Sequence, residues 1–396
     1  MNLLIFFSII FTTIGICFSP TLIGVADLLI FFSIILSVPL VVKHKIRLPI
    51  PNKFLILTFI IACISSMIVI PDIALALKAI KKARYFLFGA LSYYPFYFFF
   101  SRKNDLKNLF KKYYLRFFVV CFGLSFAYGL YQVYQIEGSI FALLRGVRMA
   151  GSIHITKFAY ISSFTASLAI SFIFLLNLDK KNKIFSITLS VLSVVGVLTS
   201  KTRGALLSLL ASLSVGIYFK SKKLAFIIFG FLAILVGTMI VISNTSYSDS
   251  VRMLTLKNDS TLHRIALYKS GVVIFKEKPW LGFGYRQSVN EVPRVAKEYK
   301  IENLFYPERI HHTFLEIAAD IGIFGLLAFC GWFFSWGYVT LVSPSAFTKS
   351  TLALVVNAFV CAQFDVFNQT VMFAFILLAF NMSLVTDRLA RNKLNE

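Results

Sequence analysis

Residues 312–340 read HTFLEIAADIGIFGLLAFCGWFFSWGYVT, and this stretch decides the class of fold. A helix needs about 20 apolar residues to cross a hydrocarbon layer of roughly 30 Å, so the stretch can cross at a tilt or begin outside the layer. Its apolar residues run on continuously and do not alternate with polar ones. This pattern fits a membrane-spanning helix and does not fit a strand of a transmembrane barrel.

Stretches of the same kind fill the chain. The twelve lie near residues 3–19, 22–42, 54–70, 84–100, 115–135, 157–177, 184–200, 204–219, 224–243, 312–340, 347–364 and 369–386. Charged residues make up only 14% of the sequence, whereas soluble domains contain about 25%. The sequence therefore predicts an all-α polytopic membrane protein with about twelve transmembrane helices and one large, partly helical outer loop.

Basic residues predict the orientation of these helices, because Lys and Arg in short loops mark the cytoplasmic side. If the N-terminus is cytoplasmic, the connections between stretches alternate between the two sides of the membrane. The cytoplasmic connections and the C-terminal tail then carry twenty Lys and Arg, and the short outer connections carry nine. We therefore expect both termini in the cytoplasm. The chain then divides into residues 1–243 with nine helices, an outer loop domain at 244–310, and residues 311–396 with three helices and a tail.

The net charge of +23 raises the question of a nucleic-acid partner. Half of the basic residues fall at the predicted cytoplasmic face, where anionic lipid headgroups account for them. The sequence contains no recognisable nucleic-acid-binding module, so we expect membrane lipids and no nucleic acid as partners.

The outer loop domain is the main polar segment of the chain. It holds eleven Lys or Arg and seven Asp or Glu, and it leads directly into His311 and His312. Ser260 and Thr261 supply hydroxyls for an N-cap, so a helix is predicted to start there with Arg264 in its first turns. The segment Pro279–Gly284 ends this helix.

Three shorter outer segments are also basic. The turn Thr199–Ala205 combines two cations with hydroxyls and a glycine, which suits close approach of an anion. The loop Arg145–Ser152 is rich in glycine and positive charge. Lys78, Lys81, Lys82 and Arg84 precede the fourth stretch. Each could instead be an ordinary polar segment that contacts lipid headgroups.

The histidine pair offers two chemistries. On a helix, His312, Glu316 and Asp320 would share one face, and a carboxylate beside a histidine raises its basicity. Two adjacent histidines could instead hold a metal ion, but no third ligand stands at a suitable spacing. Several arginines, a histidine and few acids suit an anionic substrate whose leaving group is neutralised by cations.

At these residues the sequence resembles the O-antigen ligase family, within the wider superfamily of lipid-linked-glycan ligases and polymerases. Thr199–Ala205 looks like that family's Ser-x-Ser-Arg-Gly turn. Residues 264–284 look like its Arg-rich helix followed by Pro-(apolar)-x-Gly-x-Gly. His311–Glu316, followed by Gly322 and Gly325, is similar to His-Asn-x-x-Leu-(Glu/Gln) with Gly-x-x-Gly after it.

Arg148–Gly151 fits the family's Arg-x-x-Gly pattern, and two departures stand out. His312 occupies a position where the family usually has Asn, so either histidine could act, although the spacing to Leu315 favours His311. Lys201 and Thr202 replace a more usual Ser pair.

The resemblance implies a metal-independent, inverting glycosyl transfer without a cofactor, in the periplasm, by a protein of the bacterial inner membrane. The donor would be a glycan on undecaprenyl diphosphate and the acceptor a sugar hydroxyl of the lipid A–core oligosaccharide. A histidine, His311 or His312, would act as general base, and Arg203 and Arg264 would bind the diphosphate. Further substrate-binding candidates are Arg145, Arg148, Lys201, Arg309, Arg84 and Glu316, the last orienting His312. We expect a monomer.

Related architectures leave other functions open. An O-antigen polymerase or a protein O-oligosaccharyltransferase would share the arginine and histidine chemistry and differ in the acceptor. A secondary transporter fits less well, because its ionisable residues would lie at the bilayer midplane on broken helices.

Overall fold

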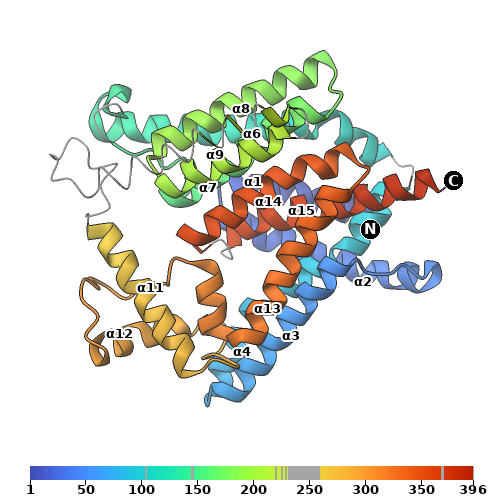
Figure 1. The fold of residues 1–396 in the computed structure, drawn as a ribbon. Helices are drawn as coiled ribbons and strands as arrows, with labels where there is room; N and C mark the ends of the chain where they lie inside the picture. Colours follow the sequence, from blue (N-terminus) through green and yellow to red (C-terminus); the bar gives the residue numbers. More distant parts are fainter. Residues whose placement is uncertain are drawn as a thin grey trace.

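The computed structural model describes residues 1–102, 105–143, 147–218, 259–366 and 370–395, with a few positions between 221 and 230 (Figure 1). The described residues are helical and include no strand, which confirms the all-α prediction. The predicted span at 224–243 and the loop at 244–258 fall almost entirely outside the described residues.

The elements follow one another in chain order. They are α1 (Asn2–Cys17), α2 (Pro20–His44), α3 (Ile50–Val69), α4 (Ile73–Leu91), α5 (Tyr93–Ser101), α6 (Asp105–Glu137), the 3₁₀ turn η1 (Ile140–Leu143), α7 (Ile155–Leu175), α8 (Lys180–Ser200), α9 (Arg203–Tyr218), α11 (Asp259–Glu277), α12 (Ser288–Glu298), α13 (Thr313–Val342), α14 (Ala346–Phe364) and α15 (Thr370–Leu394).

Eight of the described helices are long and apolar enough to cross a membrane, so the chain is a multi-pass membrane protein. They are α2, α3, the 112–137 part of α6, α7, α8, α13, α14 and the 371–394 part of α15. Two more predicted spans are shorter apolar helices, α1 and α9. The predicted number of twelve is therefore not confirmed.

The single span predicted at 84–100 is divided between two helices in the structure. The chain forms α4 from Ile73, where the Asp72 carboxylate accepts the backbone N–H of Ala74 at 2.8 Å. It then turns at Ser92, whose hydroxyl donates to the carbonyl of Gly89 at 3.1 Å, and continues as α5. The N-cap extends the helix backwards over the lysines, which consequently lie on a helix and not in the turn before one.

A break within α13 provides the attachment point for the segment that follows α11. Ile321 and Gly322 leave the helical conformation, and this frees carbonyls of the preceding turn. The segment after α11 uses them: Phe283 N–H donates to Ala319 O at 3.1 Å and Gly284 N–H donates to Asp320 O at 2.8 Å. The Gly-x-Gly motif therefore holds the loop domain against the broken transmembrane helix.

A small hydrophobic cluster joins α11 and α12 to α13. Leu267 and Ile274 on α11 pack with Val292 and Val295 on α12 and with Ala319 on α13, and all five are buried. Figure 1 shows α11 and α12 beside the first half of α13. As predicted, a helix spans Arg264 and ends before Pro279. This helix packs against α13.

Gly322 is expected to be essential for this join. Its φ is +70°, and a Cβ would lie 2.0 Å from Trp280 O, so Gly322→Ala combines backbone strain with a backbone clash. We expect a loss of at least about 1–3 kcal/mol of stability, seen as a lower Tm in detergent. Gly337→Ala on the same helix is the control, because its Cβ would meet Val355 Cγ1 at an ordinary 3.6 Å. Equal Tm values for the two variants would contradict this account.

Candidate functional site

His311 lies just before α13 and is held by two carboxylates. Its Nδ1 is 3.1 Å from Asp365 Oδ1, and its Nε2 is 3.0 Å from Glu308 Oε2. Carboxylates only accept hydrogen bonds, so a ring that donates from both nitrogens, the imidazolium, satisfies both contacts. The Asp365 side chain is 4% exposed and the Glu308 side chain 45%, so one partner is fixed and the other faces solvent.

The pKa values of this pair are displaced in opposite directions. Burial acts to lower the pKa of His311, but the hydrogen bond and charge of Asp365, with a contribution from Glu308, outweigh burial and raise it. Burial acts to raise the pKa of Asp365, but the hydrogen bond and charge of His311, with contributions from the Val366 N–H and the charge of Arg264, together outweigh burial, and the pKa is lowered. The pair therefore favours a charged histidine and an ionised aspartate.

Backbone contacts fix the histidine in place. The Tyr268 hydroxyl, from α11, lies 3.2 Å from His311 O and 3.1 Å from Gln363 O at the end of α14. Thr313 Oγ1 donates to Asp365 O at 2.8 Å. These bonds join α11, α13 and α14 at the site.

His312 has a different role. Its Nδ1 accepts the N–H of Leu315 at 3.2 Å, so it is the N-cap of α13. Burial lowers the pKa of His312, which agrees with a neutral, accepting ring. Of the two histidines, His311 is thus the one with carboxylate partners.

Glu316 does not orient His312, contrary to the expectation from their spacing. The i, i+4 argument requires both residues to be helical, but His312 is extended, with φ of −149°. Glu316 is instead buried in an ion pair with Arg309, whose Nε donates to Glu316 Oε1 at 2.9 Å. Arg309 accordingly points to α13 and not to His311.

Arg148 joins two of the predicted basic loops. Its Nε donates to Ser200 O at 2.8 Å, and Nη2 donates to Thr202 Oγ1 at 3.0 Å. Lys201 ends α8 in the left-handed conformation, with φ of 52°, and this reverses the chain so that Arg203 opens α9. The turn predicted around Arg203 is therefore present and is braced by Arg148.

Arg264 connects this turn to the histidine. It lies close enough to His311 and Asp365 for its charge to act on both. It also repels Arg148 and Arg203: burial and the charge of Arg264 lower the pKa of Arg148. We call Arg148, Arg203 and Arg264 the arginine group. Three like charges brought together beside a histidine form a site for an anion.

A buried polar network holds the helices that carry this group. Asn357 on α14 donates from Nδ2 to Ser163 O on α7 at 3.0 Å, and Ser163 Oγ lies 3.0 Å from Ala205 O on α9. Hydrogen bonds between buried helices inside a membrane protein fix their packing. The ends of α9 and α14, with Arg203 and Asp365, are thereby placed relative to each other.

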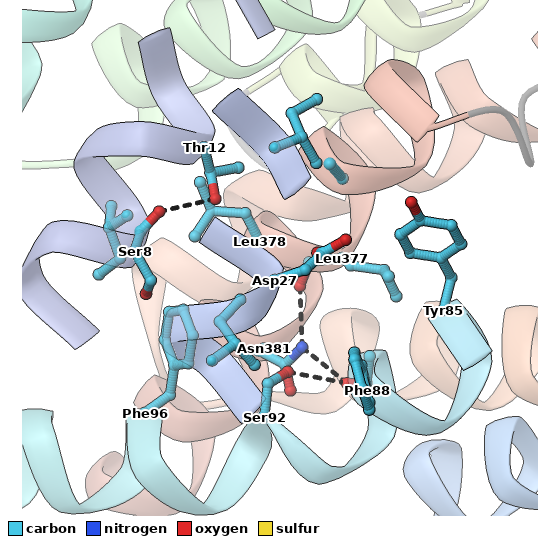
Figure 2. A pocket seen from close by; sticks show the side chains of 15 residues that line it. Ser8, Thr12, Asp27, Tyr85, Phe88, Ser92, Phe96, Leu377, Leu378 and Asn381 are labelled. Atoms are coloured by element: carbon cyan, nitrogen blue, oxygen red, sulfur yellow. Dashed lines mark hydrogen bonds between the residues drawn. The ribbon is translucent and has the colours of Figure 1, made fainter. Parts of the chain in front are cut away.

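Two further predicted site residues are not placed with His311. Arg145 lies outside the described residues. Arg84 acts on Asp27, beside a small cavity of about 40 Å³ that Asp27, Tyr85, Leu377 and Asn381 help to line. Figure 2 shows this cavity, whose labelled side chains come from α1, α2, α4, α5 and α15.

Asp365 and Glu308 are the residues that the motifs did not indicate. Asp365 is the only acid in residues 321–386, so an acid isolated in an apolar region was the available signal. Within the described part of the chain, no three His, Cys, Asp or Glu side chains gather in a way that could hold a metal ion.

The fold and the site together define a class: a multi-pass membrane protein with a carboxylate-held histidine and an arginine group at the ends of its helices. Residues 188–330 match the family model described as O-antigen ligase, a region that includes Arg203, Arg264 and His311. This match supports a relationship of residues 188–330 to the O-antigen ligase family. A search of curated proteins gave no match.

Proposed function

We propose that this protein transfers a glycan from undecaprenyl diphosphate to a sugar hydroxyl of the lipid A–core oligosaccharide, with inversion and without a metal ion. The placement of His311 against Asp365 beside the arginine group carries the proposal. In this reading the site faces the periplasm and the protein lies in the bacterial inner membrane with both termini in the cytoplasm.

The proposed reaction is a single displacement. The acceptor hydroxyl loses its proton to His311 Nε2, and its oxygen forms a bond to the anomeric carbon. The bond from that carbon to the phosphate oxygen breaks, and its electron pair leaves with the diphosphate, whose charge Arg148, Arg203 and Arg264 stabilise. Asp365 holds Nδ1–H and stabilises the imidazolium that forms.

Glu308 occupies the position that the acceptor would take. Because Glu308 is half exposed and the Asp365 partner is buried, displacement of Glu308 leaves Nε2 accessible while Asp365 keeps the ring oriented. The proton on Nε2 in the resting imidazolium must depart before the ring can act as a base.

Acceptor choice tests the proposal directly. Purified protein would be incubated with a lipid-linked glycan, either with lipid A–core or with no second acceptor. Glycan attached to lipid A–core supports ligation, and added chelator should leave its rate unchanged. Lengthened lipid-linked chains in the absence of lipid A–core would instead identify a polymerase.

The pH dependence should respond to Glu308. The base form of His311 is needed, so the rate should fall as pH drops through its raised pKa. Glu308→Gln removes one contribution that raises this pKa, so the acid limb of the rate profile should move to lower pH while the plateau at high pH is kept. Initial rates between about pH 5 and 9 measure this. Glu302→Gln, an exposed change in the same loop, is the control, and superimposed profiles for wild type and Glu308→Gln would contradict the assignment.

A further inference from the structure

Four basic side chains, from α4 and from the segments before and after α12, form a second group beside α13. Lys82 on α4 lies within electrostatic reach of Lys78 on the same helix, of Arg286 after the Gly-x-Gly segment, and of Arg309. Lys78 and Lys82 are one helical turn apart and therefore share a face of α4. We call these four residues the second cation group.

Two buried acids lie beside the second cation group. They are Glu316 and Asp320, which are 2% and 0% exposed. Arg309 donates to Glu316, and Asp320 Oδ1 accepts the N–H of Ser288 at 3.0 Å. The charges of Lys78, Arg286 and Arg309 all act on Lys82, and cations gathered in a partly buried wall attract an anion.

The wall is rigid. Ser65 Oγ donates to Leu281 O at 2.5 Å, and the N–H of Tyr285 donates to Ser66 Oγ at 3.2 Å, which fixes the segment before Arg286 against α3. The Tyr285 ring is buried with its edge toward Phe86 of α4. Arg286, which follows Tyr285, is thereby held beside α4, the helix that carries Lys78 and Lys82.

Two features distinguish this group from the arginine group. Arg309 points to Glu316 on α13, whereas His311, two residues on, points to Asp365 beyond α14. The second cation group also begins next to an apolar surface: Ile73 and Leu77 of α4 are 67% and 55% exposed, ahead of Lys78. Such a helix suits the boundary between lipid tails and headgroups.

We infer that the second cation group binds a phosphate group of the acceptor glycolipid, while the arginine group binds the diphosphate of the donor. The inference rests on the proposed function for the roles of the two lipids. A transfer between two anionic lipids needs two anion sites with the base between them, and Arg309 and His311 lie on one short segment that separates the two groups. Lysine and arginine are the usual protein partners of a phosphate group.

Steady-state kinetics of the full-length enzyme test the inference. Lys82→Ala should raise the KM for the lipid A–core acceptor about tenfold, the effect of one charge-assisted hydrogen bond, and leave the KM for the donor within about twofold. Lys297→Ala is the control, because it removes an exposed lysine of another helix of the same loop segment, α12. An unchanged acceptor KM in Lys82→Ala, or a raised donor KM, would overturn the inference.

Direct binding separates failure of the inference from failure of the proposed function. The purified protein would be titrated with lipid A that carries two phosphates, with the same lipid lacking phosphates, and with inorganic phosphate. Lys82→Ala should weaken binding of the phosphorylated lipid about tenfold, whereas Arg264→Ala should not. This result without any glycan transfer would remove the proposed function and keep the phosphate site. Transfer with no effect of Lys82→Ala on lipid binding, or displacement of the lipid by equimolar inorganic phosphate, would remove the inference.

Discussion

His311→Ala is expected to lower the rate of glycan transfer by about 10²–10⁴, the contribution of a positioned general base. His311 is the histidine with two carboxylate partners, and its backbone is held by the Tyr268 hydroxyl. Removing the imidazole leaves the arginine group in place, so donor binding should be retained. Transfer measured at saturating donor and acceptor concentrations would show a lower kcat with little change in the donor KM.

His312→Ala is the matched control for this prediction. Its loss removes the N-cap of α13, which costs about 1 kcal/mol of stability and lowers Tm slightly. The rate should stay within a few-fold of wild type. Near-normal transfer by His311→Ala together with a large loss in His312→Ala would reverse the assignment of the base.

The membrane helices were predictable because they depend on local composition. An apolar run of sufficient length has to form a helix in a bilayer whatever its neighbours are, and α2, α3, α7, α8, α13 and α14 follow the predicted stretches closely. The division of the 84–100 stretch was not predictable from hydropathy. It depends on the Asp72 cap, which extends α4 backwards, and on the turn at Ser92.

The pairing of side chains in the site was harder to predict. Orientation alone indicated that Arg148, Arg203, Arg264 and His311 lie at one end of the helices, and the structure brings these four together. Asp365 lies 54 residues beyond His311, and the packing of α14 against α13, α7 and α9 brings it close. Helical spacing predicted that Glu316 would orient His312. The helix begins at Thr313, one residue too late for that spacing to apply to His312.

Arg264→Ala is expected to reduce transfer by about 10²–10³, the loss typical for one donor that stabilises developing negative charge. Arg264 links the arginine group to the histidine pair. Its charge acts on Arg148 and Arg203, and also on His311 and Asp365. Arg264→Lys should recover only part of the rate, because lysine keeps the charge and lacks the planar fork that binds two phosphate oxygens. Single-turnover release of the lipid diphosphate would measure the defect.

Two further observations would separate this role from a structural one. Removing Arg264 relieves its repulsion of Arg148 and Arg203, so Tm should be unchanged or higher while the rate falls. Arg264 also acts to lower the pKa of His311, so Arg264→Ala should move the acid limb of the rate profile to higher pH, opposite to Glu308→Gln. Arg294→Ala is the control, since Arg294 is exposed on α12 and paired with Glu277, Glu291 and Glu298. A fall in Tm that accounts for the lost rate, with an unmoved acid limb, would show that Arg264 supports the fold and does not bind the diphosphate.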